Sequence, residues 1–174
     1  MGEDHQHGTG SGNLRGRGNK NENGNGNGIG RGRENGMETD VAINNLQQFV
    51  DRYPNSTLID SCNNIIDGLR FKLETKSFES VRLYSKTEKY MAAVSSALTF
   101  MEDYPMSGFK EEVHYLLVMN SYYLAKNSVE NKKKERIEQT IERYSTFVAA
   151  FPDSKFVRLL AGYDDEMRKE LREY

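Results

Sequence analysis

The sequence has no tryptophan, one cysteine and three prolines among its 174 residues. The single cysteine, Cys62, excludes an intrachain disulfide and does not decide the compartment. No apolar run approaches the roughly 20 residues that a membrane-spanning helix needs, and the N-terminus lacks the apolar centre of a signal peptide. The formal net charge of −2 gives no overall attraction to nucleic acid or to an anionic membrane.

Catalytic patterns are also missing. We find no nucleophile beside a base, no phosphate-binding loop and no paired-cysteine motif, so we predict no enzymatic activity and no cofactor. Glu111 and His114 form one Glu-x-x-His element, but a carboxylate di-iron site needs two such elements on facing helices. His5 and His7 have no rigid frame around them, so the sequence predicts no metal site.

Glycine is concentrated at one end, because 12 of the 15 glycines lie in residues 1–36. Such a segment has almost nothing apolar to bury, so we predict a disordered Gly/Asn/Arg-rich tail over residues 1–37. Its arginine–glycine steps, Arg15 to Gly18 and Arg31 to Arg33, are typical of RNA-binding arms. Interleaved aromatic residues are absent, so we favour a flexible linker and expect no nucleic acid partner.

The three prolines share one context, an aromatic residue, proline, any residue and then serine. Because the residue before proline is pushed out of helical geometry, a helix should end at each aromatic residue. The Ser, Asn or Asp that follows can cap the next helix. The three copies are Tyr53-Pro54-Asn55-Ser56, Tyr104-Pro105-Met106-Ser107 and Phe151-Pro152-Asp153-Ser154.

Each proline also follows a helical face with spacings of 4, 3 and 4 residues, which begins at a small side chain. This repetition predicts that two helices meet closely in each copy. The faces are Ala42, Leu46, Phe49 and Tyr53; Ala93, Ala97, Phe100 and Tyr104; and Thr140, Tyr144, Phe147 and Phe151.

These features predict an all-α, tetratricopeptide-like array of helical hairpins over residues 38–174, an α-solenoid of about six helices. The prolines lie 51 and 47 residues apart, more than the roughly 34 residues of one such repeat. We attribute the first excess to a long helix that Gly68 could kink, and the second to longer helices or a mobile loop near residues 127–136. The expected helices cover residues 38–53, 57–87, 89–104, 107–127, 132–151 and 154–173. The first is the second helix of its repeat, and no partner for it can be read in residues 1–37.

The stretch from Leu46 to Tyr174 resembles the C-terminal half of BamD-type outer-membrane assembly lipoproteins, in the form found in Bacteroidetes. The phrases that carry the resemblance are FVDRYPNS (49–56), LRFKLETKSFESVRLYSKTEKYMAAVSSALTFMEDYP (69–105) and YLLVMNSYYLAKNSVENKKKERIEQTIERYSTFVAAFPDSKF (115–156). The resemblance implies a scaffold that helps assemble and insert β-barrel proteins, at the periplasmic face of the outer membrane. Its later repeats would dock the periplasmic domains of the barrel-assembly protein, and its early repeats would handle unfolded substrates.

The resemblance also implies a lipid on an N-terminal cysteine, which would be the family's membrane anchor. No lipid-acceptor cysteine can be read in this sequence, because Cys62 is expected deep inside a helix. The alternative function is a generic tetratricopeptide adaptor in the cytoplasm, which would have the same fold. An RNA-associated protein with an arginine–glycine arm is a third hypothesis, from a different class.

Partner contacts are expected on two surfaces. On the long helix, the side opposite Leu73, Val81 and Tyr84 carries an aromatic ring beside cations, and this could equally be a solvated face with one exposed ring. The second surface is a run of lysines near the fifth helix. The candidate partner-binding residues are Phe78, Arg82, Ser85, Lys86, Lys132, Lys133 and Lys134.

Overall fold

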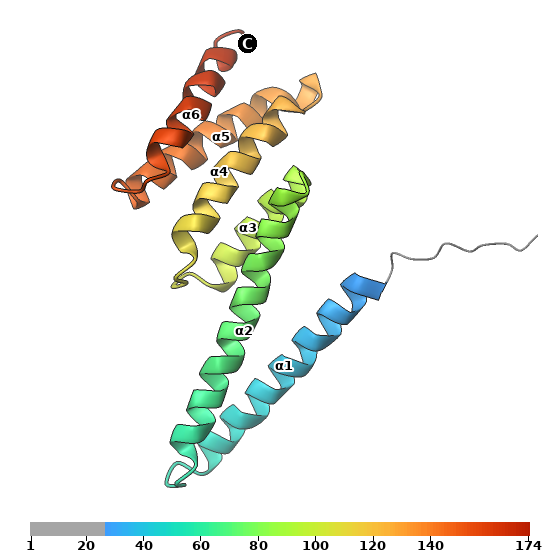
Figure 1. Cartoon of the computed structure of the whole chain (residues 1–174), viewed down its shortest axis with the longest axis vertical. Helices are drawn as coiled ribbons and strands as arrows, with labels where there is room; N and C mark the ends of the chain where they lie inside the picture. The colour runs from blue at the N-terminus through green and yellow to red at the C-terminus, as the bar shows by residue number, and fades with distance from the viewer. Residues whose placement is uncertain (1–26) are drawn as a thin grey trace, which may run out of the picture.

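The computed structural model describes residues 27–174, with side chains from Gly36 onward. This part of the chain folds into six α-helices and contains no strand, which confirms the predicted all-helical repeat architecture (Figure 1). The helices are α1 (Asn27–Arg52), α2 (Ile59–Lys86), α3 (Tyr90–Asp103), α4 (Lys110–Lys126), α5 (Glu130–Ala150) and α6 (Val157–Leu171).

The predicted start of the first helix was wrong. We expected it near residue 38, and α1 begins at Asn27 instead. Once a helix has formed, each added residue gains a backbone hydrogen bond at little further cost, so helix can extend into a segment with weak propensity. The rest of the predicted tail, residues 1–26, lies outside the described residues.

The three proline turns have the same hydrogen bonds. The amide of each aromatic residue bonds to the carbonyl four residues earlier and closes the helix, in the pairs Tyr53–Phe49, Tyr104–Phe100 and Phe151–Phe147. Each serine Oγ then accepts a hydrogen bond from the amide two residues later, in the pairs Ser56–Leu58, Ser107–Phe109 and Ser154–Phe156. The serine therefore fixes the turn just before the helix, and does not cap the first helical amides as the sequence suggested.

Neighbouring helices pack in order along the array. Helices α2, α4 and α6 also touch across it, whereas α1 contacts only α2. A predicted helical face lies in the core where helices cover it on both sides. Ala93, Ala97 and Phe100 on α3 are 1% exposed or less. In α1 the corresponding residues Ala42 and Leu46 are only half buried, since a single helix covers them.

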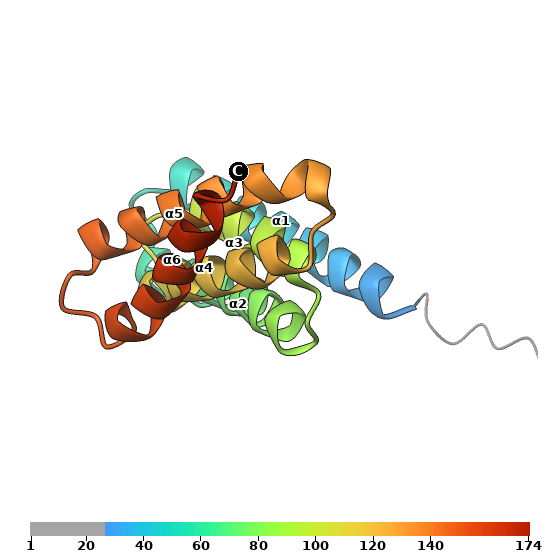
Figure 2. The ribbon, with the colours of Figure 1, turned by 90° about the horizontal axis from the view of Figure 1, so that it is seen from above.

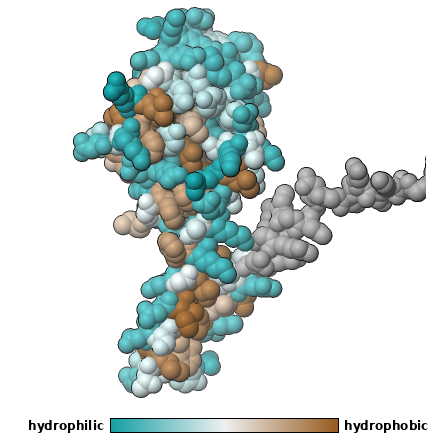
Figure 3. Space-filling view, in the orientation of Figure 1, coloured by the Kyte–Doolittle hydropathy of each residue, from teal (hydrophilic) through white to brown (hydrophobic). Residues whose placement is uncertain are grey.

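Helix accounts for the extra residues in both intervals between the prolines. Helix α2 continues through Gly68 and is 28 residues long, so no helix break occurs there. Its first half extends beyond α3 and, with the end of α1, forms a narrow protruding hairpin that carries apolar surface (Figures 1 and 3). The second excess lengthens α4 and α5, whose connection is only residues 127–129, so the alternative of a mobile loop was wrong.

Helices α2 and α4 run in the same direction. Their C-terminal ends therefore lie on one edge of the array, as two perpendicular views agree (Figures 1 and 2). The short connections at residues 87–89 and 127–129 follow these ends. We call this the connection edge, and the three proline turns lie away from it, at the opposite ends of the helices.

Candidate functional site

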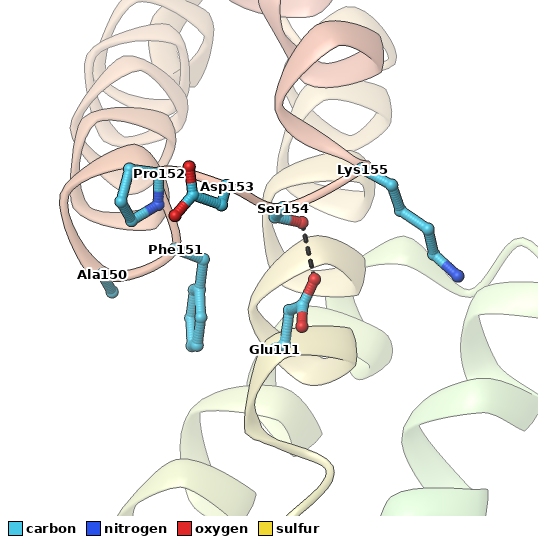
Figure 4. A pocket seen from close by; sticks show the side chains of 7 residues that line it. All are labelled: Glu111, Ala150, Phe151, Pro152, Asp153, Ser154 and Lys155. Carbon is cyan, nitrogen blue, oxygen red and sulfur yellow. Dashed lines mark hydrogen bonds between the residues drawn. The ribbon is translucent and has the colours of Figure 1, made fainter.

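The last proline turn is held by α4. The Ser154 hydroxyl donates a 2.6 Å hydrogen bond to Glu111 Oε1, beside a hollow of about 530 Å³ lined by residues 150–155 and Glu111 (Figure 4). Phe151 meets the His114 ring edge-on, with centroids 5.4 Å apart, and Phe156 stacks on Tyr115 at 4.1 Å. One face of α4 thus contacts Phe151, Ser154 and Phe156 of this turn.

Phe78 is a core residue, so its predicted role as an exposed partner contact was wrong. Its side chain is 4% exposed. Phe109, from the second proline turn, stacks on it with centroids 4.3 Å apart and planes 6° apart, and Phe100 lies at 6.2 Å. Phe78 therefore stacks on the ring that follows the second turn, as Tyr115 stacks on the ring that follows the third.

The other candidates on α2 have different surroundings. Arg82 bonds to Glu79 at 2.9 Å and pairs with Glu112 of α4 at 3.6 Å, and about half of its side chain is exposed. Ser85 faces α4, because its Oγ accepts a hydrogen bond from the buried Asn120. Lys86 is exposed at the end of α2. Of this group, only Arg82 and Lys86 are available to a partner.

The lysine run on α5 divides in the same way. Lys132 and Lys134 are exposed. Lys133 instead forms a 2.5 Å ion pair with Glu170 of α6, whose side chain is 18% exposed. Lys133 therefore joins two helices, and it is not the freely exposed partner contact expected of the lysine run.

The structure brings Lys86, Lys132 and Lys134 to the connection edge, since they lie in the last turn of α2 and the first turns of α5. The same edge carries exposed apolar side chains. Leu83, Met91 and Val129 are 57%, 55% and 66% exposed. Met91 lines a hollow of about 540 Å³ together with Lys89, Tyr90, Ala92, Ser95 and Leu124. Exposed apolar side chains near cations are typical of a protein-binding surface.

Tyrosines connect α3, α4 and α6 below this edge. Tyr123 stacks on Tyr90 at 5.2 Å, and Tyr122 stacks on Tyr163 at 4.3 Å. The hydrogen bond between the Tyr123 and Tyr163 hydroxyls, with burial, raises the pKa of Tyr163 to about 12. These packed rings give the edge a rigid base.

Charge pairs add to this base. Glu166 of α6 accepts hydrogen bonds from Lys126 at 2.6 Å and from the Tyr122 hydroxyl at 2.5 Å. The Lys126 ammonium, and then the Tyr122 hydroxyl, hold the pKa of the Glu166 carboxyl below its usual range. The same bond raises the pKa of Lys126. Helices α4 and α6 are therefore tied at their exposed ends as well as through the core.

The Glu-x-x-His element has a structural use. Glu111 accepts the Ser154 hydrogen bond, and His114 packs against Phe151. Burial, and then the nearby Lys110, lower the pKa of His114. Among the side chains that the structure describes, residues 36–174, no group of three or more His, Cys, Asp or Glu is placed to hold a metal ion.

The comparison with protein families shows which family the chain belongs to. The family model YfiO, described as an outer membrane lipoprotein, matches residues 26–107 and 93–173. The chain belongs to this family. The membership confirms the resemblance to BamD-type lipoproteins at the level of the family. A search of curated proteins gave no match.

For a YfiO family member, the helical part is consistent with a protein-binding role. Among the helices of residues 27–174, none has the length and apolar character to span a membrane. Sequence reasoning missed Leu83, Met91 and Val129, because an exposed apolar residue and a core residue give the same pattern along a helix. The available signal was their position beside the short connections, where neighbouring helices do not cover them.

Proposed function

We propose that this chain is a non-catalytic docking scaffold in the machinery that assembles and inserts β-barrel proteins into the outer membrane. It acts at the periplasmic face, where it binds the periplasmic domains of the barrel-assembly protein. The observation that carries the proposal is the YfiO family match across residues 26–173, which covers almost all of the described helices. The narrower Bacteroidetes form of the family, with this chain as its C-terminal half, is part of the same proposal.

The connection edge is the surface we assign to this docking. Its cations Lys86, Lys132 and Lys134 share this edge with apolar side chains that the fold leaves uncovered. A partner with acidic residues around an apolar centre fits such a surface, because apolar burial slows dissociation and rim charges speed the encounter. Arg82 lies on the adjoining face of α2, where its pair with Glu112 holds the guanidinium between two helices.

The test measures binding of the whole chain to the purified periplasmic domains of a barrel-assembly protein, by biolayer interferometry over a range of salt concentrations. The variant Lys86→Glu/Lys132→Glu/Lys134→Glu should associate more slowly, and its association rate should depend less on salt. The variant Met91→Ser/Val129→Ser should instead dissociate faster, since it removes apolar contact area.

A matched control reverses two exposed cations elsewhere, Lys72→Glu/Arg158→Glu, and should bind like the wild type. Circular dichroism checks that each variant keeps its helices. The proposal is wrong if the unaltered chain shows no binding at about 50 µM, a concentration that detects even weak transient complexes. It is also wrong in its choice of surface if the control and the edge variants weaken binding equally.

A further inference from the structure

The second and third proline turns enclose equivalent hollows. At the third turn, Glu111 of α4 and residues 150–155 line a hollow of about 530 Å³ (Figure 4). At the second turn, Glu74 of α2 and residues 103–108 help to line a hollow of about 560 Å³. The two glutamates correspond, because each lies four residues before the ring that stacks on the residue after its turn. The side chains of the two hollows can therefore be compared position by position.

The third turn satisfies its own charged groups. Glu111 accepts a 2.6 Å hydrogen bond from the Ser154 hydroxyl. Lys155, three residues after the proline, lines the same hollow, and its ammonium lies over the Phe156 ring at 5.0 Å from the centroid. The chain itself thus supplies a donor for the acid and a cation for the ring.

The second turn has more acid and lacks that cation. Gly108 stands where the third turn has Lys155, and Asp103 stands where the third turn has Ala150. Within the part of the chain that the structure describes, the carboxylates of Glu74 and Asp103 form no hydrogen bond and no ion pair. The acids of this hollow are therefore left for a group from outside the chain.

The electrostatic environment of the second hollow is negative. Tyr104 lines it, and burial, and then nearby carboxylates, raise the pKa of its hydroxyl; these carboxylates are Asp103, Asp40 and Glu74, from three helices. Arg70 is the cation among the lining residues, but it pairs with Asp67 at 4.0 Å and more than half of each side chain is exposed. The hollow thus favours a further positive charge.

The mouth of this hollow is apolar. Phe71 is 59% exposed and Met106 is 93% exposed, and both line the hollow. The Phe71 ring lies 6.3 Å from Phe109, on the part of α2 that extends beyond α3. The residue equivalent to Met106 at the third turn is Asp153. Helices α2, α3 and α4 surround this hollow and all three are described, so its exposure is a property of this part of the array.

We propose that the hollow of the second proline turn is a docking site for a partner protein, and that its occupant is a lysine or arginine side chain with an apolar neighbour. The cation lies beside the carboxylates of Glu74 and Asp103, and the apolar neighbour covers Phe71 and Met106. Opposite charge gives such a contact its selectivity, and the apolar area adds affinity. The site lies at the other end of the helices from the connection edge, so it does not depend on the function proposed for that edge.

The probe is the peptide acetyl-Gly-Leu-Arg-Leu-Gly-amide, titrated into the isotope-labelled whole chain and followed by NMR chemical shifts. The amides of residues 103–108 should shift in a saturable way. The same peptide with glutamine in place of arginine should bind at least about fivefold more weakly, because it keeps the apolar contacts and lacks the charge.

Substitutions of the acids test the same contact from the other side. The variant Glu74→Gln/Asp103→Asn should lose at least about fivefold in affinity for the arginine peptide. The matched control Glu138→Gln/Asp165→Asn removes two exposed acids elsewhere and should bind like the wild type. Equal losses in both variants overturn the choice of site, since they would reflect only the net charge of the protein.

The sharpest variant restores the missing lysine. A Cβ added at Gly108 would meet no atom within 4 Å beyond its chain neighbours, so Gly108→Lys should fold normally and place an ammonium near Phe109, as Lys155 does at Phe156. It should bind the peptide at least about fivefold more weakly than Gly108→Ala, which should bind like the wild type. Thermal unfolding checks that both variants are folded.

Equal binding by the Gly108→Lys and Gly108→Ala variants overturns the proposal. The absence of saturable shifts at about 10 mM peptide also overturns it, because that concentration detects contacts of millimolar affinity. A dimer in sedimentation equilibrium that Gly108→Lys abolishes and the peptide does not displace would overturn the partner and assign the hollow to a second copy of the chain.

Discussion

Phe109 lies flat against Phe78, with ring centroids 4.3 Å apart and planes 6° apart. The two residues are 31 positions apart, and their contact joins the second proline turn to the C-terminal half of α2. Arg82 also lies over the Phe78 ring, with its guanidinium carbon 5.7 Å from the ring centroid. This contact explains why a residue that looked like a binding-surface aromatic is part of the core.

Replacing Phe78 with alanine should lower the free energy of unfolding by about 3–5 kcal/mol, since a large buried ring leaves a cavity that cannot collapse fully. Urea denaturation followed by circular dichroism measures the change. Leu83→Ala, five residues along the same helix and 57% exposed, is the control and should stay within about 0.5 kcal/mol. A Phe78→Ala protein of normal stability that had lost only partner binding would restore the original interpretation.

The helices and turns could be predicted because their signals are local. Proline excludes helix at each turn, and the 4-3-4 faces identify core positions such as Ala97, Phe100 and Phe147, all 0% exposed. The start of α1 at Asn27 could not be predicted, because glycine-rich sequence carries no helical signal of its own. The residues that follow this segment in α1, and not its own composition, determine that the segment is helical.

The candidate site was harder to predict, because exposure depends on which helix ends overlap. Phe78 and Leu83 are apolar residues of the same helix, and contacts with Phe109 and Phe100 bury the first whereas the second stays exposed. Lys133 likewise differs from Lys132 only because Glu170 of α6 lies opposite it. Contacts between residues far apart in sequence therefore decide both cases, and a single sequence does not reveal them.

Glu88 occupies an unfavourable backbone conformation between α2 and α3. Its φ is 56°, and the amides of Glu88 and Lys89 bond back to the carbonyls of Ser85 and Tyr84 in a helix-ending motif that prefers glycine. A Glu88→Gly protein should be more stable than a Glu88→Ala protein by about 1 kcal/mol, because only the alanine keeps the left-handed strain. Both variants remove the carboxylate, so their difference in urea midpoint isolates the backbone. Equal midpoints would contradict the prediction.

His114 should make stability depend on pH. Burial, and then Lys110, lower its pKa in the folded protein, so the unfolded chain binds the proton more readily. The stabilising effect is therefore present above the ordinary value of about 6.5 and is lost as the pH falls from there through the lowered folded pKa. The urea midpoint of the wild type should fall over this range, and that of His114→Gln should fall less. Parallel curves for the two proteins would show that another group is responsible.

Ser56 and Ser154 make the same hydrogen bond in two different proline turns. Only Ser154 also bonds to a carboxylate, that of Glu111 at 2.6 Å. Ser56→Ala should therefore lose the turn bond alone, which costs about 1 kcal/mol. Ser154→Ala should cost about 1–2 kcal/mol more, since a hydrogen bond to a charged group is the stronger kind and Glu111 is left without this donor. Urea denaturation of the two proteins measures the difference directly. The double variant Ser154→Ala/Glu111→Gln tests its origin, because the second substitution should then add little. Equal losses for Ser56→Ala and Ser154→Ala would mean that α4 holds the last turn through Tyr115 and His114 alone.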